Sequence, residues 1–216
     1  MVISSRLILL NTTKVGEKSL VLHCLCKDYG RRSFIVSAGK SGAMALYQPL
    51  NILDAELVEN SRSELWRLRG VSAVHPLGGI RGSMGKTAIS LFMSEVLYRV
   101  IHDGDDTDGL FDWCERSILT LEGLEADFAN FHLRWLLELC SVLGFSPEPE
   151  DLAPFAGSHY REIVSLLDAG FEEFMLFPLN GRARGDIADI VLRYLSAHIE
   201  ANLNIRSLSV LSELFR

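Results

Sequence analysis

Residues 85–87, Gly-Lys-Thr, are the first candidates for chemistry, because they follow a glycine-rich stretch and open a helical pattern. In phosphate-binding loops, backbone N–H groups and a lysine converge on the phosphates of a nucleotide. That pattern needs a glycine five residues before Gly85, but Ile80 stands there and Gly79 is one residue too early. We therefore interpret residues 76–85 as a flexible linker between domains and expect no nucleotide hydrolysis.

Other catalytic and metal-binding arrangements are missing from the sequence. The six histidines are scattered, no Gly-x-Ser-x-Gly motif occurs, and acidic pairs such as Glu172-Glu173 and Asp105-Asp106 lie in polar stretches. The four cysteines lie among apolar residues, with no Cys-x-x-Cys pair and no histidine at ligand spacing: Cys24, Cys26, Cys114 and Cys140. The sequence predicts buried free thiols, no metal, no cofactor and no enzymatic activity.

Charge is distributed unevenly along the chain. Residues 1–82 hold eleven Lys/Arg and six Asp/Glu, a net +5, whereas residues 83–216 hold ten and twenty-two, a net −12. A basic module of this kind is typical of proteins that meet a polyanion. The candidate DNA-binding residues are the cations of this module that flank turns or share a strand face: Lys14, Lys18, Lys27, Arg31, Arg32, Lys40, Arg67 and Arg69.

The elements that position these cations read as strands. Alternating or apolar runs with turn signals between them predict five strands, at 5–15, 17–26, 31–38, 48–59 and 63–74. Five short strands without helical periodicity favour a small β-barrel. Arg67 and Arg69 alternate with Trp66 and Leu68, so we expect the arginines on the outer face of the last strand and the apolar pair in the core.

Small barrels of this type bind nucleic acid on the face of strands two and three and through the loops at the rim, where cations meet phosphates and aromatic rings stack on bases. Tyr29 and Tyr47 are candidates for stacking, whereas Phe34 alternates with Val36 and is expected in the core.

Beyond the linker the apolar period becomes helical. Six helices are predicted, near 88–99, 110–121, 127–143, 160–167, 186–202 and 208–215. The fold class is therefore α+β with two domains, a five-stranded barrel at 1–80 and an all-α domain at 81–216. No stretch approaches the roughly 20 apolar residues of a membrane span, and the N-terminus lacks the features of a signal peptide. We expect a cytoplasmic, nucleoid-associated protein.

The order of features resembles the RecO family of bacterial recombination mediators. Each similar segment is short, and together they extend over nearly the whole chain: 8–10, 16–19, 29–31, 40–41, 47–50, 94–97, 131–137, 143–147 and 198–211. The resemblance implies an N-terminal OB-fold barrel followed by a helical domain. Residues 148–160 contain no cysteine, so the four-cysteine zinc site of many family members is not expected, and the loop around Lys40 is less basic than is usual for the family.

The resemblance also implies a function. A RecO-like protein binds single- and double-stranded DNA, anneals complementary strands, and works with RecR to load RecA onto DNA coated by single-stranded DNA-binding protein. Its helical domain captures the acidic C-terminal tail of that binding protein, and Arg134, in the similar segment 131–137, is the favoured contact, with Arg116 and Arg206 as weaker candidates. The alternative is a protein–protein adaptor whose barrel contacts protein instead of DNA.

Overall fold

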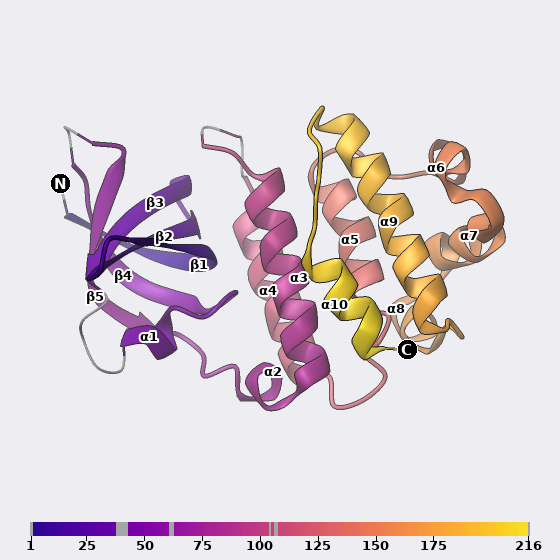
Figure 1. Ribbon diagram of the computed structural model, residues 1–216, viewed down its shortest axis with the longest axis horizontal. Coiled ribbons are helices and arrows are strands. Elements are labelled where there is room, and N and C mark those ends of the chain that lie inside the picture. Colours follow the sequence, from indigo (N-terminus) through magenta and orange to yellow (C-terminus); the bar gives the residue numbers. More distant parts are fainter. Residues whose placement is uncertain (1, 38–42, 61–62, 104, 106–107, 216) are drawn as a thin grey trace. The chain divides into compact units, whose positions relative to one another are not determined.

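The computed structural model describes residues 2–37, 43–60, 63–103, 105 and 108–215 (Figure 1). The chain divides into two compact units, Met1–Gly78 with Met93–Leu119, and Gly79–Phe92 with Thr120–Arg216. Residues 93–119 are helical in large part and belong to the same unit as the strands. The boundary at residues 80 and 81 stays a prediction, because a change from strands to helices and a division into compact units are different properties.

The first unit is built on a closed antiparallel barrel with one parallel seam, and its strands follow the order β1-β2-β3-β5-β4 (Figure 1). This is an OB-fold barrel, as the sequence predicts. The strand bounds are β1 Val2–Val15, β2 Ser19–Cys26, β3 Gly30–Ser37, β4 Ile52–Val58 and β5 Leu65–Ala73, and the short helix α1 covers Ala43–Leu46. Each strand lies within a few residues of its predicted range.

The barrel core contains every second side chain of β2 from Leu22 to Cys26. Leu22, Cys24 and Cys26 are fully buried in one cluster with Leu9 and Phe34. Because side chains alternate across a strand, the residues between them face outward. The expected burial of Cys24, Cys26 and Phe34 is therefore confirmed.

A second apolar layer lies outside the barrel. Ile8 and Leu25 are paired neighbours on β1 and β2, alternate with the core residues, and are nonetheless fully buried. The part of helix α3 (Met84–Val100) that belongs to this unit lies against this face, since the Ser94 hydroxyl donates to the Leu10 carbonyl. The outer face of β1 and β2 is thus a packed surface.

The remaining elements are helical (Figure 1). They are α2 Gly78–Gly82, α4 Leu110–Gly123, α5 Phe131–Val142, α6 Pro149–Ala156, the 3₁₀ turn Gly157–His159, α7 Tyr160–Asp168, α8 Phe171–Leu176, α9 Gly181–His198 and α10 Ser207–Leu214. Among the described residues, none of these helices is long and apolar enough to cross a membrane. All six predicted helices are present, whereas the short helices α2, α6 and α8 were not predicted.

Two helix starts differ from the prediction for local reasons. Helix α9 begins at Gly181 and not near 186, because the Asn180 side chain accepts the Ala183 N–H at 2.9 Å and caps the first turn. Helix α5 begins at Phe131 and not at 127, because Asp127 has a φ of 54°, which a helix cannot include.

The glycine-rich segment is ordered by one carboxylate, so the prediction of a flexible linker is wrong for residues 78–82. Glu122 accepts the N–H groups of Gly79 and Ile80 with its two oxygens, both at 2.7 Å. Lys86 is buried, and its Nζ donates to the Glu122 carbonyl at 2.9 Å. The anion held by this glycine-rich segment is therefore part of the chain itself.

Asn130 is the polar centre of the second unit and is 1 % exposed. Its amide nitrogen donates to the carbonyls of Phe174, Met175 and Phe177 at 3.0, 3.2 and 2.9 Å, where helix α8 ends. Its oxygen accepts Arg184 Nε at 2.8 Å. One side chain thus links the start of α5 to α8 and α9.

Candidate nucleic-acid interface

Four of the predicted DNA-binding cations are exposed on the barrel: Lys14, Lys18, Arg67 and Arg69. None of these side chains forms a hydrogen bond or an ion pair with another residue in the part of the chain that the structure describes. A cation without an internal partner keeps its full charge available to a phosphate group. These four residues, which we call the free cations, are the core of the candidate interface.

Strand register relates the free cations to one another. Thr13 of β1, Val21 of β2, Ile35 of β3 and Arg67 of β5 form one row across the barrel. With strands about 4.8 Å apart, the row spans roughly 14 Å. Lys14 follows Thr13 along β1, so its backbone lies beside this row. Its side chain starts from the opposite face of the strand, that of its partner Leu20. The expected outward direction of Arg67 and Arg69 is confirmed, with Trp66 and Leu68 packed against the barrel core.

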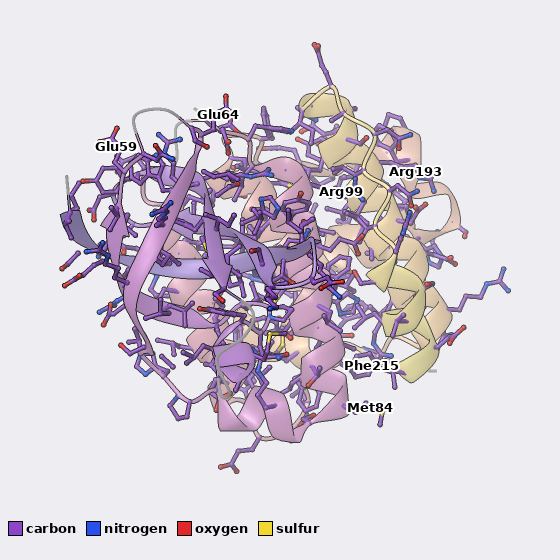
Figure 2. All side chains as sticks on the ribbon, turned by 60° about the vertical axis from the view of Figure 1, so that its left-hand side comes forward. Glu59, Glu64, Met84, Arg99, Arg193 and Phe215 are labelled. Carbon is purple, nitrogen blue, oxygen red and sulfur yellow. The ribbon has the colours of Figure 1, made fainter. Side chains whose placement is uncertain are left out.

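Acidic residues border this basic surface. Glu56 is paired with Arg69 across β4 and β5, and both are exposed. Glu59 and Glu64, close to the ends of β4 and β5, project from the barrel (Figure 2). Because these carboxylates lie among the cations, the surface attracts phosphate groups only close to the cations themselves.

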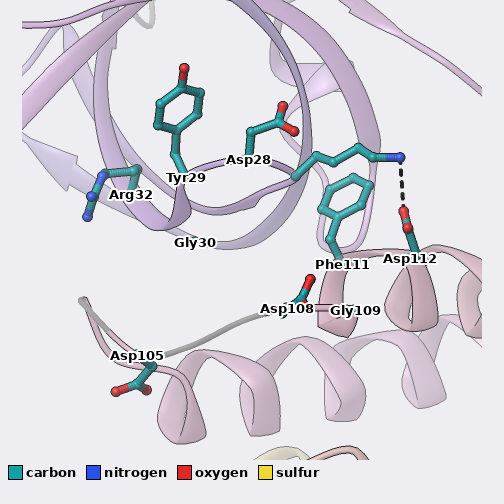
Figure 3. A pocket seen from close by; sticks show the side chains of 10 residues that line it. Asp28, Tyr29, Gly30, Arg32, Asp105, Asp108, Gly109, Phe111 and Asp112 are labelled. Atoms are coloured by element: carbon teal, nitrogen blue, oxygen red, sulfur yellow. Dashed lines mark ion pairs between the residues drawn. The ribbon is translucent and has the colours of Figure 1, made fainter.

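The cations at the β2–β3 turn have partners within the protein. Lys27 Nζ lies 3.0 Å from Asp112 Oδ1 (Figure 3). Arg31 is only 14 % exposed; its Nη1 donates to the carbonyls of Tyr98 and Ile101 at the end of α3, and its guanidinium lies 4.6 Å from the centre of the Tyr98 ring. Arg31 Nη1 therefore holds the end of a helix. The Nε of the same side chain has only an ion pair, at 3.5 Å from Asp103 Oδ1.

Arg32 is half-buried beside the same turn. Its Nη1 donates to the Arg31 carbonyl at 3.1 Å, and its guanidinium lies 5.7 Å from the centre of the Trp66 ring. Lys40 lies outside the described residues.

A hollow of about 710 Å³ opens at this turn (Figure 3). Its lining includes two cations, Lys27 and Arg32, and four carboxylates, those of Asp28, Asp105, Asp108 and Asp112. A hollow with opposite charges on its walls is a poor receptor for a phosphate, because the carboxylates repel the anion that the cations attract.

The face of β2 and β3 is covered at His23. The His23 ring lies between the Thr13 and Ser33 hydroxyls, at 3.1 and 2.9 Å, and its centre is 5.1 Å from that of Tyr98. Burial lowers the pKa of His23, and the charge of Arg31 lowers it further. The face on which we expected nucleic acid is thus partly occupied by α3.

The two tyrosines proposed for stacking are partly packed. The Tyr29 ring meets the Trp66 ring edge to face at 5.8 Å, and Tyr47 packs against the barrel core. Burial raises the pKa of Tyr47. Both rings are half-buried, so each presents only part of its surface to a base.

The candidate partner-tail residues lie on separate elements. Arg134 of α5 is 29 % exposed, and its Nε lies 2.6 Å from Glu138 Oε1 while its Nη1 donates to the Ala169 carbonyl at 3.0 Å. It lines a hollow of about 210 Å³ whose walls include Leu137 and Leu166.

Arg116 is exposed on α4 in the first unit, and Arg206 is exposed at the start of α10 in the second. Arg206 is not among the described residues that line the hollow at Arg134. Arg116 belongs to the other unit.

The cysteines are free and buried. Burial raises the pKa of each thiol, in the case of Cys140 to about 12. Within the described residues, no group of three or more His, Cys, Asp or Glu side chains could hold a metal ion.

The carboxylates that pair with the barrel were missed at the sequence level. Asp103, Asp112 and Glu115 contact Arg31, Lys27 and Arg6, which are about 70 to 110 positions away in the sequence. The signal in the sequence was the density of acidic residues in 103–115, of which we considered only the pair Asp105-Asp106 and placed it in a polar stretch.

The barrel with its free cations and the helices that follow it place this chain among proteins that carry an OB-fold domain. Comparison with known proteins gives relatives that are named as DNA repair proteins. The chain matches "Recombination protein O N terminal" over residues 1–77 and "Recombination protein O C terminal" over residues 81–151. It is 29 % identical to "DNA repair protein RecO" of Flavobacterium psychrophilum over the whole of both chains. It is 28 % identical to the protein of that name from Bacteroides fragilis, over 96 % of this chain and 97 % of the relative. The chain belongs to the RecO family of DNA repair and recombination proteins.

Proposed function

We propose that this protein is a non-enzymatic recombination mediator that binds single- and double-stranded DNA through the free cations of its barrel. The observation that supports this most directly is the presence of four exposed cations on the barrel that have no partner among the described residues, in a chain whose net charge is −7. Contacts of this kind attract phosphates without regard to base sequence. Lys27 and Arg32 are second-rank contacts, since each already has a partner.

Strand annealing follows from the same surface. Two complementary strands repel each other through their phosphates, and a cationic surface that binds both reduces this repulsion without making or breaking a covalent bond. We infer that the protein anneals complementary strands and, with RecR, loads RecA onto DNA coated by single-stranded DNA-binding protein, in the cytoplasm at the nucleoid.

Binding of a fluorescent single-stranded oligonucleotide tests the assignment. The variant with Lys14→Ala, Lys18→Ala, Arg67→Ala and Arg69→Ala should lower the affinity and flatten its dependence on salt, by about 0.7 units of the logarithmic slope for each phosphate that is no longer neutralised. The matched control removes four exposed arginines of helices, so it has the same net charge as the barrel variant: Arg99→Ala, Arg161→Ala, Arg182→Ala and Arg193→Ala. Equal effects of the two variants would reject the barrel interface and favour the adaptor.

We further propose that Arg134 receives the acidic C-terminal tail of single-stranded DNA-binding protein. A hollow that has leucine side chains on its wall beside a cation suits a peptide that ends in an apolar residue and a free carboxylate. The tail would compete with Glu138 for the guanidinium. Arg134→Ala should weaken binding of the tail peptide in fluorescence anisotropy, whereas Arg161→Ala, also on a helix of the second unit, should leave it unchanged.

A further inference from the structure

Three cations of the barrel each lie against a carboxylate of the segment that follows α3. The pairs are Arg6 Nη1 with Glu115 Oε1 at 2.8 Å, Lys27 Nζ with Asp112 Oδ1 at 3.0 Å, and Arg31 Nε with Asp103 Oδ1 at 3.5 Å. Arg6 Nε also lies 3.5 Å from Asp54 Oδ1 of β4, outside that segment. All six residues belong to the first compact unit. The barrel thus already contacts a row of anions that belongs to its own chain.

Two of these pairs, those of Lys27 and Arg31, lie at the strands where an OB barrel ordinarily meets nucleic acid. Lys27 and Arg31 flank the β2–β3 turn, and Arg6 lies on β1 beside them, since the Lys27 N–H donates to the Arg6 carbonyl at 3.0 Å. A carboxylate and a phosphate diester both carry one negative charge and accept hydrogen bonds through oxygen. The same guanidinium and ammonium groups therefore serve either partner.

The pairs differ in their exposure, which affects how readily each is replaced. Lys27 and Asp112 are 45 % and 51 % exposed, so water and salt reach both. Arg31 and Glu115 are each 14 % exposed, but each has a partner that is more open to solvent, Asp103 at 60 % and Arg6 at 36 %. Exposed ion pairs contribute little to stability and are screened by salt. An incoming polyanion can therefore exchange with these carboxylates.

We propose that Asp103, Asp112 and Glu115 act as an intramolecular substitute for phosphate groups, which keeps Arg6, Lys27 and Arg31 from DNA until DNA displaces them. The inference rests on the proposed DNA-binding function and adds an autoinhibitory contact to it. In this arrangement the free cations make the first contacts, and the paired cations join only when the acidic segment is released.

Neutralising the three carboxylates tests the proposal. In the full chain, Asp103→Asn, Asp112→Asn and Glu115→Gln together should raise the affinity for a single-stranded oligonucleotide. Three further phosphate contacts should steepen the logarithmic salt slope by about 2 units, at about 0.7 per contact. The affinity gain over the unmodified protein should then shrink by roughly 20-fold between 50 and 200 mM salt.

A control with the same charge change separates a local effect from a general one. Glu125→Gln, Glu172→Gln and Glu173→Gln remove three exposed carboxylates of the second unit. This control should gain less affinity and keep the slope of the unmodified protein. Adding Lys27→Ala to the first variant should reverse about one third of the steepening, because the released ammonium is then missing.

Hydrogen exchange of the unmodified protein gives a second readout that does not depend on how the variant folds. Adding the oligonucleotide should speed amide exchange in residues 108–119, since the acidic side chains are displaced. Equal slopes in the two triple variants, or unchanged exchange at 108–119 in the DNA complex, would overturn the proposal while DNA binding itself stands. An absence of any salt-dependent DNA binding by the unmodified protein would overturn the proposed function together with this inference.

Discussion

Replacing Asn130 should destabilise the second unit more than the loss of one buried hydrogen bond ordinarily does. Its oxygen accepts Arg184 Nε, and a hydrogen bond to a charged donor contributes about 1.5–3 kcal/mol. Its two amide hydrogens serve three carbonyls at the end of α8, and each neutral bond contributes about 0.5–1.5 kcal/mol. Phe174 is fully buried, so water does not readily replace the missing donor there. We expect Asn130→Ala to lower the free energy of unfolding by about 3–5 kcal/mol.

Urea unfolding followed by circular dichroism measures this decrease by linear extrapolation. Asn130→Asp separates the two sides of the network, because it keeps an acceptor for Arg184 and removes both donors to the carbonyls. Asn204→Ala, at an exposed position, is the control and should change stability by less than about 0.5 kcal/mol. A decrease below about 1.5 kcal/mol for Asn130→Ala would refute the reasoning, since it would mean that solvent satisfies these groups.

Three further predictions concern buried groups. Burial, and to a lesser extent the charge of Arg184, lowers the pKa of His132 to about 3. Below about pH 6.5 the His132 imidazole therefore binds a proton in the unfolded chain but not in the folded protein. The free energy of unfolding should fall by up to about 1.4 kcal/mol per pH unit as the pH is lowered to about 3. His132→Asn should lose less stability than the unmodified protein between pH 7 and 4.5 in urea unfolding; equal losses would contradict this. Gly79→Ala should cost about 1–3 kcal/mol, because its Cβ would lie 2.7 Å from the Glu122 carbonyl oxygen, whereas Gly82→Ala, with nothing within 4 Å of its Cβ, should be tolerated. Thiol labelling should be slow in the native protein and fast in denaturant at all four cysteines, and rapid labelling of the native protein would show that the thiols are accessible.

The sequence predicts the barrel well because each strand carries its own pattern of burial. Cys24 and Cys26 alternate with outward residues, and Arg67 alternates with Trp66, so local period alone assigns each side chain to the core or the surface. The predicted helices were found for the same reason. Helix α8 was missed because six residues are too few to establish a period. Helix α6 was missed because Pro149 and Pro154, at its start and inside it, are residues that ordinarily signal a break.

The environment of the candidate site was harder to predict, because it depends on contacts between distant parts of the chain. Arg31 looked like its neighbour Arg32 in the sequence, but it reaches carbonyls 67 and 70 positions away, at Tyr98 and Ile101. Lys27 likewise meets Asp112 only through the fold. Charge counting identified the basic module, and it could not tell a paired cation from an unpaired one. Both states contribute equally to a net charge.

The barrel is closed, in the part of the chain that the structure describes, by three parallel residue pairs: Ser33 with Leu65, Phe34 with Trp66, and Ile35 with Arg67. By comparison, β2 and β3 pair along the whole length of both strands. The seam between β3 and β5 is therefore the place where the barrel can open at the least cost, as a short-lived local fluctuation that leaves the longer ladders intact. Arg67 lies on the β5 side of this seam, so a polyanion that contacts Arg67 together with Lys18, next to β2 on the other side, would favour the closed form. DNA affinity and the opening rate of the seam are then linked, and a substitution that loosens the seam would weaken DNA binding without touching any cation.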